Sequence, residues 1–150
     1  MAMIIDGKAL AAKIRQEISG EVNTLAEKEG RRPGLAVIQV GADPASSVYV
    51  RNKKKACEEA GIVSFGYDLP EESSQAQLLE LIDALNKDER VDGILCQLPL
   101  PKHMDEFTVL NAIIPEKDVG GFHPVNVGLL STGHKSLVSC TPAGVLEMLK

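Results

Sequence analysis

An almost unbroken apolar run, Leu35-Ala36-Val37-Ile38-Gln39-Val40, constrains the fold of this chain more than any other feature. A strand with one face in water alternates apolar and polar side chains, so this run predicts a strand covered on both faces. Strands of that kind belong to parallel sheets, whose crossover connections are usually helices. The run therefore predicts strands that alternate with helices, which is an α/β layer architecture with a mainly parallel sheet.

The rest of the chain supplies the elements that such a sheet requires. Apolar residues recur at spacings of three and four before Gly30, as expected of an amphipathic helix. The predicted strands cover residues 35–40, 62–69 and 93–98. The predicted helices cover residues 8–29, 45–60, a stretch with Leu78, Leu81, Ile82 and Leu85 on one face, 105–113, and the residues that follow 141.

Capping residues mark where three of these helices begin. The pair Asp43-Pro44 is placed to cap the second helix and to occupy its first turn. Ser73 or Ser74 can cap the third helix, and Thr141-Pro142 opens the last one. No helix or strand is predicted over residues 115–133, a segment rich in glycine and proline.

Right-handed crossovers place the carboxyl ends of parallel strands on one edge of the sheet, where α/β proteins bind ligands. Three segments are predicted to lie at that edge: residues 41–47, 97–101 and 118–124. The common phosphate-binding glycine motifs are absent from the 150 residues, so this segment does not itself resemble a dinucleotide or P-loop domain.

Composition excludes several classes of function. A formal net charge of -5 and a pI of about 5.2 argue against nucleic-acid binding by bulk electrostatics. No apolar run approaches the roughly 20 residues of a membrane helix, and the N-terminus lacks a signal peptide's features. Three widely spaced cysteines and three histidines without helical spacing predict reduced thiols, no metal site and a cytoplasmic protein.

The second helix carries the first candidate for chemistry. Tyr49 and Lys53 are four residues apart, so they share a helix face and form a plausible proton-transfer pair. Lys54 and Lys55 add positive charge that is expected to favour the neutral amine of Lys53. The alternative interpretation is a solvated basic helix face with Tyr49 half-buried.

Two further polar residues lie at the predicted binding edge. Gln97 ends an apolar strand just before Pro99-Leu100-Pro101, where it either reaches a ligand or satisfies nearby loop backbone. Asp118 either caps a turn or binds a ligand. The adjacent pair Gly120-Gly121 indicates unusual backbone angles or a close approach of two chain segments.

Taken together, these motifs resemble the bifunctional methylenetetrahydrofolate dehydrogenase/cyclohydrolase family across nearly the whole chain. The resemblance rests on Tyr49-Val50-x-x-Lys53, Ala60-Gly61-Ile62, Gly93-Ile94-Leu95-Cys96-Gln97-Leu98-Pro99-Leu100-Pro101, Pro115-Glu116-Lys117-Asp118-Val119, Gly121-Phe122-His123-Pro124-x-Asn126-x-Gly128 and Cys140-Thr141-Pro142.

The family resemblance implies a function in one-carbon metabolism. Such enzymes oxidise methylene-tetrahydrofolate with a nicotinamide cofactor, usually NADP, and hydrolyse the methenyl product to formyl-tetrahydrofolate. By resemblance, Lys53 is the catalytic lysine, Gln97 positions it, and Tyr49 lines the cleft for the pterin and aminobenzoate. The substrate site also includes Leu98, Pro99, Pro101 and the position of Gly120.

The resemblance also sets the expected architecture. Residues 1–150 correspond to the three-layer αβα lobe at the N-terminus of a two-domain enzyme that usually dimerises. The NADP-binding Rossmann domain has no counterpart in these residues. We therefore expect no hydride transfer from this segment alone, a monomer rather than a dimer, and an exposed apolar surface where a second lobe would pack.

One residue departs from the family pattern. Gly120 stands where the family has an aspartate that binds the amino-pyrimidine end of the pterin. Glycine supplies no acceptor, so we expect weakened folate binding and turnover. Two alternatives to a working catalytic lobe are a non-catalytic folate-binding module or structural fragment, and an unrelated flavodoxin-like regulatory domain.

Overall fold

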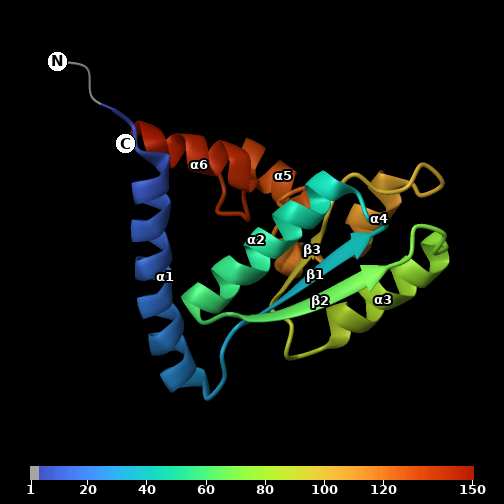
Figure 1. Ribbon diagram of the computed structural model, residues 1–150, viewed down its shortest axis with the longest axis horizontal. Helices are drawn as coiled ribbons and strands as arrows, with labels where there is room; N and C mark the ends of the chain where they lie inside the picture. Colours follow the sequence, from blue (N-terminus) through green and yellow to red (C-terminus); the bar gives the residue numbers. More distant parts are fainter. Residues whose placement is uncertain (1–3) are drawn as a thin grey trace.

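The computed structural model describes residues 4–150 and contains one parallel sheet of three strands in the order β2-β1-β3 (Figure 1). Strand β1 pairs with β2 from Gly34↔Val63 to Val40↔Leu69 and with β3 from Leu35↔Gly93 to Ile38↔Cys96. The strands are β1 (Gly34–Val40), β2 (Val63–Leu69) and β3 (Gly93–Cys96). The helices are α1 (Gly7–Glu29), α2 (Pro44–Ala60), α3 (Gln75–Lys87), α4 (Glu106–Ala112), the 3-10 helix η1 (Pro115–Lys117), α5 (Pro124–Ser131) and α6 (Cys140–Leu149).

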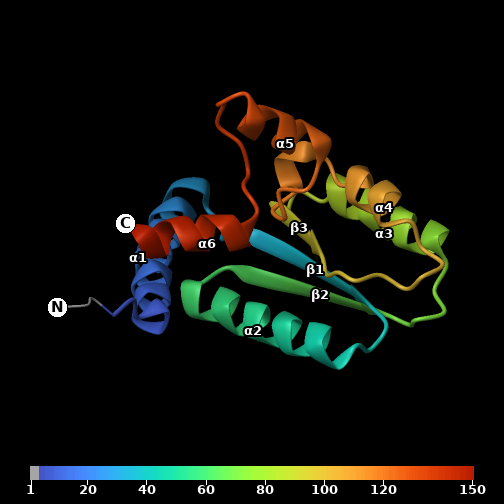
Figure 2. The ribbon, with the colours of Figure 1, turned by 90° about the horizontal axis from the view of Figure 1, so that it is seen from above.

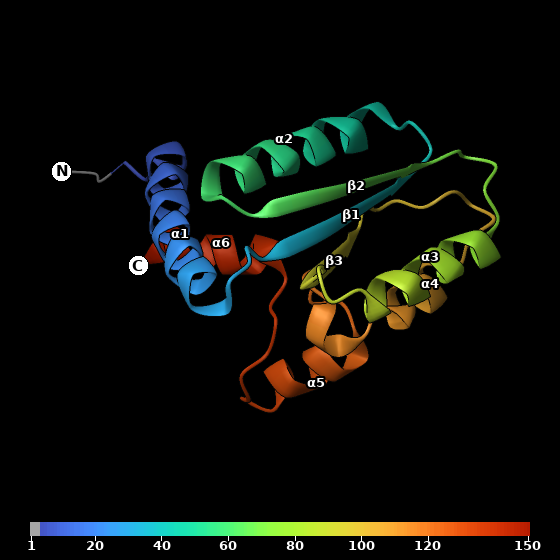
Figure 3. The ribbon, with the colours of Figure 1, turned by 90° about the horizontal axis from the view of Figure 1, so that it is seen from below.

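The sheet lies between two layers of helices. Figures 2 and 3 show α2 along one face and α3 with α4 along the other. Alternate residues of β1 divide between these faces, because side chains of a strand point to opposite sides. Ala36, Ile38 and Val40 join the main core with α3, whereas Gln39 reaches Ser47 of α2. The predicted three-layer α/β architecture with a parallel sheet is confirmed.

Local sequence signals set most of the helix boundaries. Asp43 caps α2 by accepting a hydrogen bond from the Ser46 N–H at 2.8 Å, and Pro44 is its first residue, as predicted. At the start of α3, Ser74 rather than Ser73 forms a capping box with Gln77. Gly61 ends α2 with φ of 80°, a conformation that favours glycine.

Two predicted element boundaries, the end of β3 and the start of α6, were wrong. Strand β3 ends at Cys96, two residues before the predicted end, because Pro99 cannot donate to a ladder. Helix α6 begins at Cys140, so the cap is Ser139 rather than Thr141, and Ser139 makes no side-chain capping bond.

The segment 115–133, for which no element was predicted, contains η1 and α5. Its prolines begin both helices: Pro115 opens η1, and Pro124 opens α5 behind His123, whose ring accepts from the Val125 N–H. Proline suits the first position of a helix because that N–H has no partner in any case. The composition of the segment therefore indicated a loop where it in fact marked two helix starts.

Several whole-chain expectations can be compared with residues 4–150. Helix α6 exposes Leu146 and Leu149, by 60% and 71%, which agrees with the expected apolar surface. None of the described helices is long and apolar enough to cross a membrane. Across the same residues, no group of three or more His, Cys, Asp or Glu side chains could hold a metal ion.

Candidate active site

The central contact of the site joins α2 to the end of β3. The Lys53 ammonium nitrogen donates to Gln97 Oε1 at 2.7 Å, although the two residues are 44 positions apart. Burial lowers the pKa of Lys53, and the nearby Cys140 acts weakly in the opposite direction. Partial burial therefore makes the neutral amine of Lys53 more accessible than that of an ordinary solvated lysine.

The predicted cause of that lowered pKa was wrong. We expected the charges of Lys54 and Lys55 to favour the neutral amine, but both lysines pair with carboxylates instead. Lys54 lies 3.8 Å from Asp68 on β2, and Lys55 lies 3.9 Å from Glu59 on its own helix. Desolvation of Lys53 is the dominant cause.

The orientation of the Gln97 amide is fixed by its other end. Gln97 Nε2 donates to the Leu98 carbonyl at 2.7 Å, and a carbonyl can only accept. The amide oxygen must therefore face Lys53. Gln97 thus satisfies loop backbone, as one interpretation expected, and contacts the lysine at once, while contact with a ligand stays a prediction.

Tyr49 belongs to the same helix as Lys53 but does not take its hydrogen bond. The Tyr49 side chain is 61% exposed, more than the half-buried position of the alternative interpretation. Its ring therefore lies mostly in solvent on α2. The expected phenol–amine pair is replaced by the Lys53–Gln97 pair.

Asp118 has a structural role. The residue pairs with Ile94 in a parallel bridge, so the segment that follows runs along the free edge of β3. Its carboxylate is 2% exposed and accepts from the His123 N–H at 2.8 Å and from Asn126 Nδ2 at 3.1 Å. Of its two interpretations, capping a turn is the one that the structure supports.

The two glycines that follow Asp118 differ in what they require. Gly121 has φ of 67°, and a Cβ there would lie 2.6 Å from the Ser139 N, so no larger residue fits. Gly121 therefore lies against the residues that immediately precede α6, whose first residue is Cys140. At Gly120, a Cβ would lie 2.9 Å from the ring of Phe122, which is half-exposed and able to shift.

Sequence reasoning missed two residues near the Lys53–Gln97 pair, Ser46 through the Leu98 carbonyl and Cys140 through its proximity to Lys53. Ser46 is buried and its hydroxyl donates to the Leu98 carbonyl at 3.4 Å, the same carbonyl that fixes Gln97. Its spacing of three and seven from Tyr49 and Lys53 was a signal that could have revealed it. The sequence indicated Cys140 only as part of a motif, and its place near Lys53 follows from the close approach of Gly121 to the adjacent Ser139.

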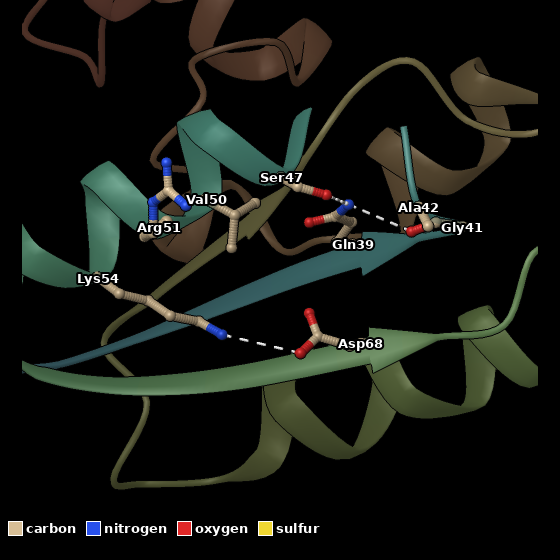
Figure 4. Close-up of a pocket in the computed structure, with 8 residues that line it drawn as sticks. All are labelled: Gln39, Gly41, Ala42, Ser47, Val50, Arg51, Lys54 and Asp68. Atoms are coloured by element: carbon tan, nitrogen blue, oxygen red, sulfur yellow. Dashed lines mark hydrogen bonds and ion pairs between the residues drawn. The ribbon is translucent and has the colours of Figure 1, made fainter. Parts of the chain in front are cut away.

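Two cavities lie at the carboxyl edge of the sheet, and neither is lined by Tyr49, Lys53 or Gln97. The first, of about 670 Å³, includes two of the predicted substrate residues. Its lining is Val40, Gly41, Ala42, Asp43, Glu71, Pro99, Leu100, Pro101, Lys102 and His103. The second, of about 380 Å³, lies beneath the other flank of α2 and contains no predicted site residue (Figure 4).

The structure is thus an α/β lobe whose sheet edge carries a half-buried lysine held by a glutamine amide. Residues 5–120 match the family model described as tetrahydrofolate dehydrogenase/cyclohydrolase, catalytic domain. The chain therefore belongs to this family. Membership overturns the flavodoxin-like alternative.

Curated relatives agree with this assignment. The chain is 60% identical over 150 residues to the bifunctional protein FolD of Magnetococcus marinus, covering all of this chain and 53% of that protein. It is 57% identical over 149 residues to the FolD of Acetivibrio thermocellus, covering 99% of this chain and 52% of the relative. The chain thus spans about half the length of the curated relatives it matches.

Solved structures show the same fold. The bifunctional FolD methylenetetrahydrofolate dehydrogenase/cyclohydrolase of Campylobacter jejuni matches with a TM-score of 0.93 and 50% identity, over 98% of this chain and 52% of that one. The Trypanosoma brucei FolD, solved with NADP cofactor and inhibitor, matches with a TM-score of 0.94 and 40% identity, over 99% and 51%.

Proposed function

We propose that this chain supplies the folate site of a methylenetetrahydrofolate dehydrogenase/cyclohydrolase and that Lys53 is its proton carrier. The observation that carries the proposal is the 2.7 Å contact between Lys53 and Gln97, together with the lowered pKa of the half-buried amine. Tetrahydrofolate derivatives are the proposed partners of the site.

The hydrolytic step needs a group that can take and return one proton. Water attacks the methenyl carbon and forms a C–O bond, while its proton passes to the neutral Lys53 amine. The resulting ammonium returns that proton to the folate nitrogen as the C–N bond breaks. The remaining hydroxyl proton leaves to solvent as the C=O bond forms, so the step gives the formyl product and releases one proton overall. The cationic substrate disfavours a neighbouring ammonium, so it supports the neutral amine at the start of this step.

The other predicted residues hold the reactants in place. Gln97 keeps the amine in position through its oxygen without adding charge, because its nitrogen is committed to Leu98. The exposed ring of Tyr49 provides a surface for the flat parts of a folate. Leu98, with Pro99 and Pro101 beyond it, forms the rigid segment on the other side.

Gly120 is proposed to weaken folate binding. The aspartate expected from the family would offer a carboxylate to the donors of the amino-pyrimidine. Asp118 does not substitute for it, since its carboxylate is buried and already accepts two hydrogen bonds. Turnover by this chain is therefore proposed to be slow.

The described residues do not fit the pyrophosphate of NADP. Such groups bind at helix N-termini with free N–H donors, but here side chains occupy the starts of the three helices that follow strands. Asp43, Ser74 and Asp105 cap α2, α3 and α4. We therefore assign hydride transfer to none of these residues and propose that parts of the enzyme outside them bind NADP.

The remaining features of the proposal follow the family resemblance. We propose that residues 1–150 form the catalytic lobe, that the family's homodimer depends on other parts of the enzyme, and that this segment alone is a monomer. Three free thiols support a reducing, cytoplasmic location. The second candidate function, a folate-binding module without catalysis, is favoured by Gly120.

Hydrolysis of methenyl-tetrahydrofolate separates the two candidates. The chain should hydrolyse it faster than buffer, and Lys53→Met should remove that excess rate. Lys55→Met is the matched control, because Lys55 is exposed on the same helix and pairs with Glu59. A rate equal to buffer for the parent chain, with folate-analogue binding retained, would leave only the non-catalytic module.

A further inference from the structure

The cavity in Figure 4 is separated from the proposed folate site by helix α2. Lys53 points to the end of β3, whereas the next residue, Lys54, reaches Asp68 on β2 at the opposite edge of the sheet. The cavity of about 380 Å³ lies on this second flank, within the size range of small-molecule sites. Its lining is Gln39, Gly41, Ala42, Ser47, Val50, Arg51, Lys54 and Asp68.

A buried amide presents an unused acceptor to this cavity. Gln39 is only 6% exposed, and its nitrogen donates to the Gly41 carbonyl at 3.2 Å and to Ser47 Oγ at 2.9 Å. The carbonyl of Gly41 can only accept, so the amide cannot be reversed. Figure 4 shows the Gln39 oxygen turned away from Ser47 toward Val50, where no described residue donates to it.

Charged groups of both signs line the same cavity as that oxygen. Gln39 and Asp68 are register partners on neighbouring strands, so both side chains lie on the α2 face of the sheet. The Lys54 ammonium extends over Gly66, where a Cβ would come within 2.6 Å of its nitrogen, so the glycine makes room for this cation. Arg51 also lines the cavity, and no hydrogen bond or ion pair joins it to another described residue.

We propose that this cavity is a second ligand site that binds a free acidic α-amino acid. The ammonium group of the ligand meets the Gln39 oxygen and the Asp68 carboxylate, both of which are acceptors. Its two carboxylates meet the cations of Lys54 and Arg51. Two cations and one anion give the lining a charge of +1, which an amino acid with two carboxylates neutralises.

An NMR titration of the ¹⁵N-labelled chain with L-glutamate and L-aspartate tests this proposal. At least one of them should give saturable shifts centred on Gly41, Ala42 and Val50. Glutarate lacks the amine and N-acetyl-L-glutamate blocks it, so both should bind about tenfold more weakly or worse. N-acetyl-L-glutamate also carries its nitrogen in an amide, so its weaker binding distinguishes a free amino acid from a glutamyl group held in an amide.

Matched variants locate the site. Asp68→Asn and Lys54→Met should each weaken binding by about tenfold, while Glu80→Gln and Lys55→Met should leave it unchanged. Lys53→Met should also leave it unchanged, so this proposal stands or falls separately from the proposed hydrolysis. The absence of saturation with either amino acid, equal binding of the analogues, unchanged binding by Asp68→Asn, or shifts centred on Gln97 would each overturn it.

Discussion

The two faces of the sheet are built for different purposes. Toward α3 and α4, the strands present apolar side chains such as Ile38 and Ile94, which are fully buried with Ile82 of α3. Toward α2, β1 presents Gln39 and β2 presents Asp68, which Lys54 of α2 reaches. The α3 face is therefore packed with apolar side chains, while the α2 face combines buried apolar residues such as Val37 and Val50 with polar and charged groups.

Replacing Lys53 should give the largest effect that we expect, a loss of hydrolysis rate without a comparable loss of stability. Lys53→Met should lower the hydrolysis rate about 10²- to 10⁴-fold, the usual contribution of a positioned proton carrier. The free energy of unfolding should change little, because a half-buried amine loses one hydrogen bond and gains apolar contact. Rate measurements and urea unfolding of the same variant check the two expectations. A large loss of stability would show that Lys53 also holds the fold together, which would contradict the contrast between the two faces.

The opposite result is expected on the apolar face. Ile82→Ala removes a fully buried side chain from the α3 layer and should lower the free energy of unfolding by about 2–5 kcal/mol. Urea unfolding measures this loss. Val48→Ala is the control, because Val48 is 45% exposed on α2, and it should cost about 0.5 kcal/mol or less.

Substitutions at position 120 test how much of the proposed weakness of folate binding is due to this one residue. Gly120→Asp should strengthen binding of a folate analogue by about tenfold or more, because each charge-assisted bond is strong. Gly120→Ala adds only the Cβ that displaces Phe122 and serves as the steric control. Equal affinities of the parent and Gly120→Asp would contradict the assigned role of this position.

A charge change at Gln97 sharpens the account of the lysine. Gln97→Glu places a carboxylate beside Lys53, which favours the ammonium and raises its pKa. Because the neutral amine is the proposed base, the rising limb of the hydrolysis rate should move to higher pH by about one unit or more. The profile is measured after subtracting the buffer rate at each pH, and an unchanged profile would show that Lys53 is not the base.

Thiol labelling compares the reactivity of the three cysteines and tests the smallest of the expected effects. Burial raises the pKa of Cys57 and, to about 12, that of Cys96, so both should resist a thiol reagent in the native chain. Cys140 is exposed and should react alone. One thiol in native protein and three in denaturant are expected, and Cys140→Ser should show none before unfolding.

The fold was predictable where the signals are local. The apolar run of β1 and the Asp43-Pro44 start of α2 each depend on a few adjacent residues, and both were confirmed. Residues 124–131 were missed because proline and glycine mark helix starts as well as loops. The start of α6 at Cys140 was missed because the cap has no side-chain hydrogen bond to announce it.

The candidate site was less accessible to sequence reasoning. Only the family resemblance linked Lys53 to Gln97, since no spacing relates residues on different elements. The direction of Lys54 and Lys55 depends on Asp68 and Glu59, so the cause predicted for the lowered pKa was wrong. The roles of Tyr49, Lys53 and Gln97 in catalysis stay predictions.

The most direct test of the central claim is an NMR titration of the Lys53 side-chain amine. Lys53→Met identifies its resonance by removing it. We predict a pKa below the ordinary lysine value of about 10.4, because burial disfavours the ammonium. A pKa at or above that value would contradict the assignment of Lys53 as the proton carrier.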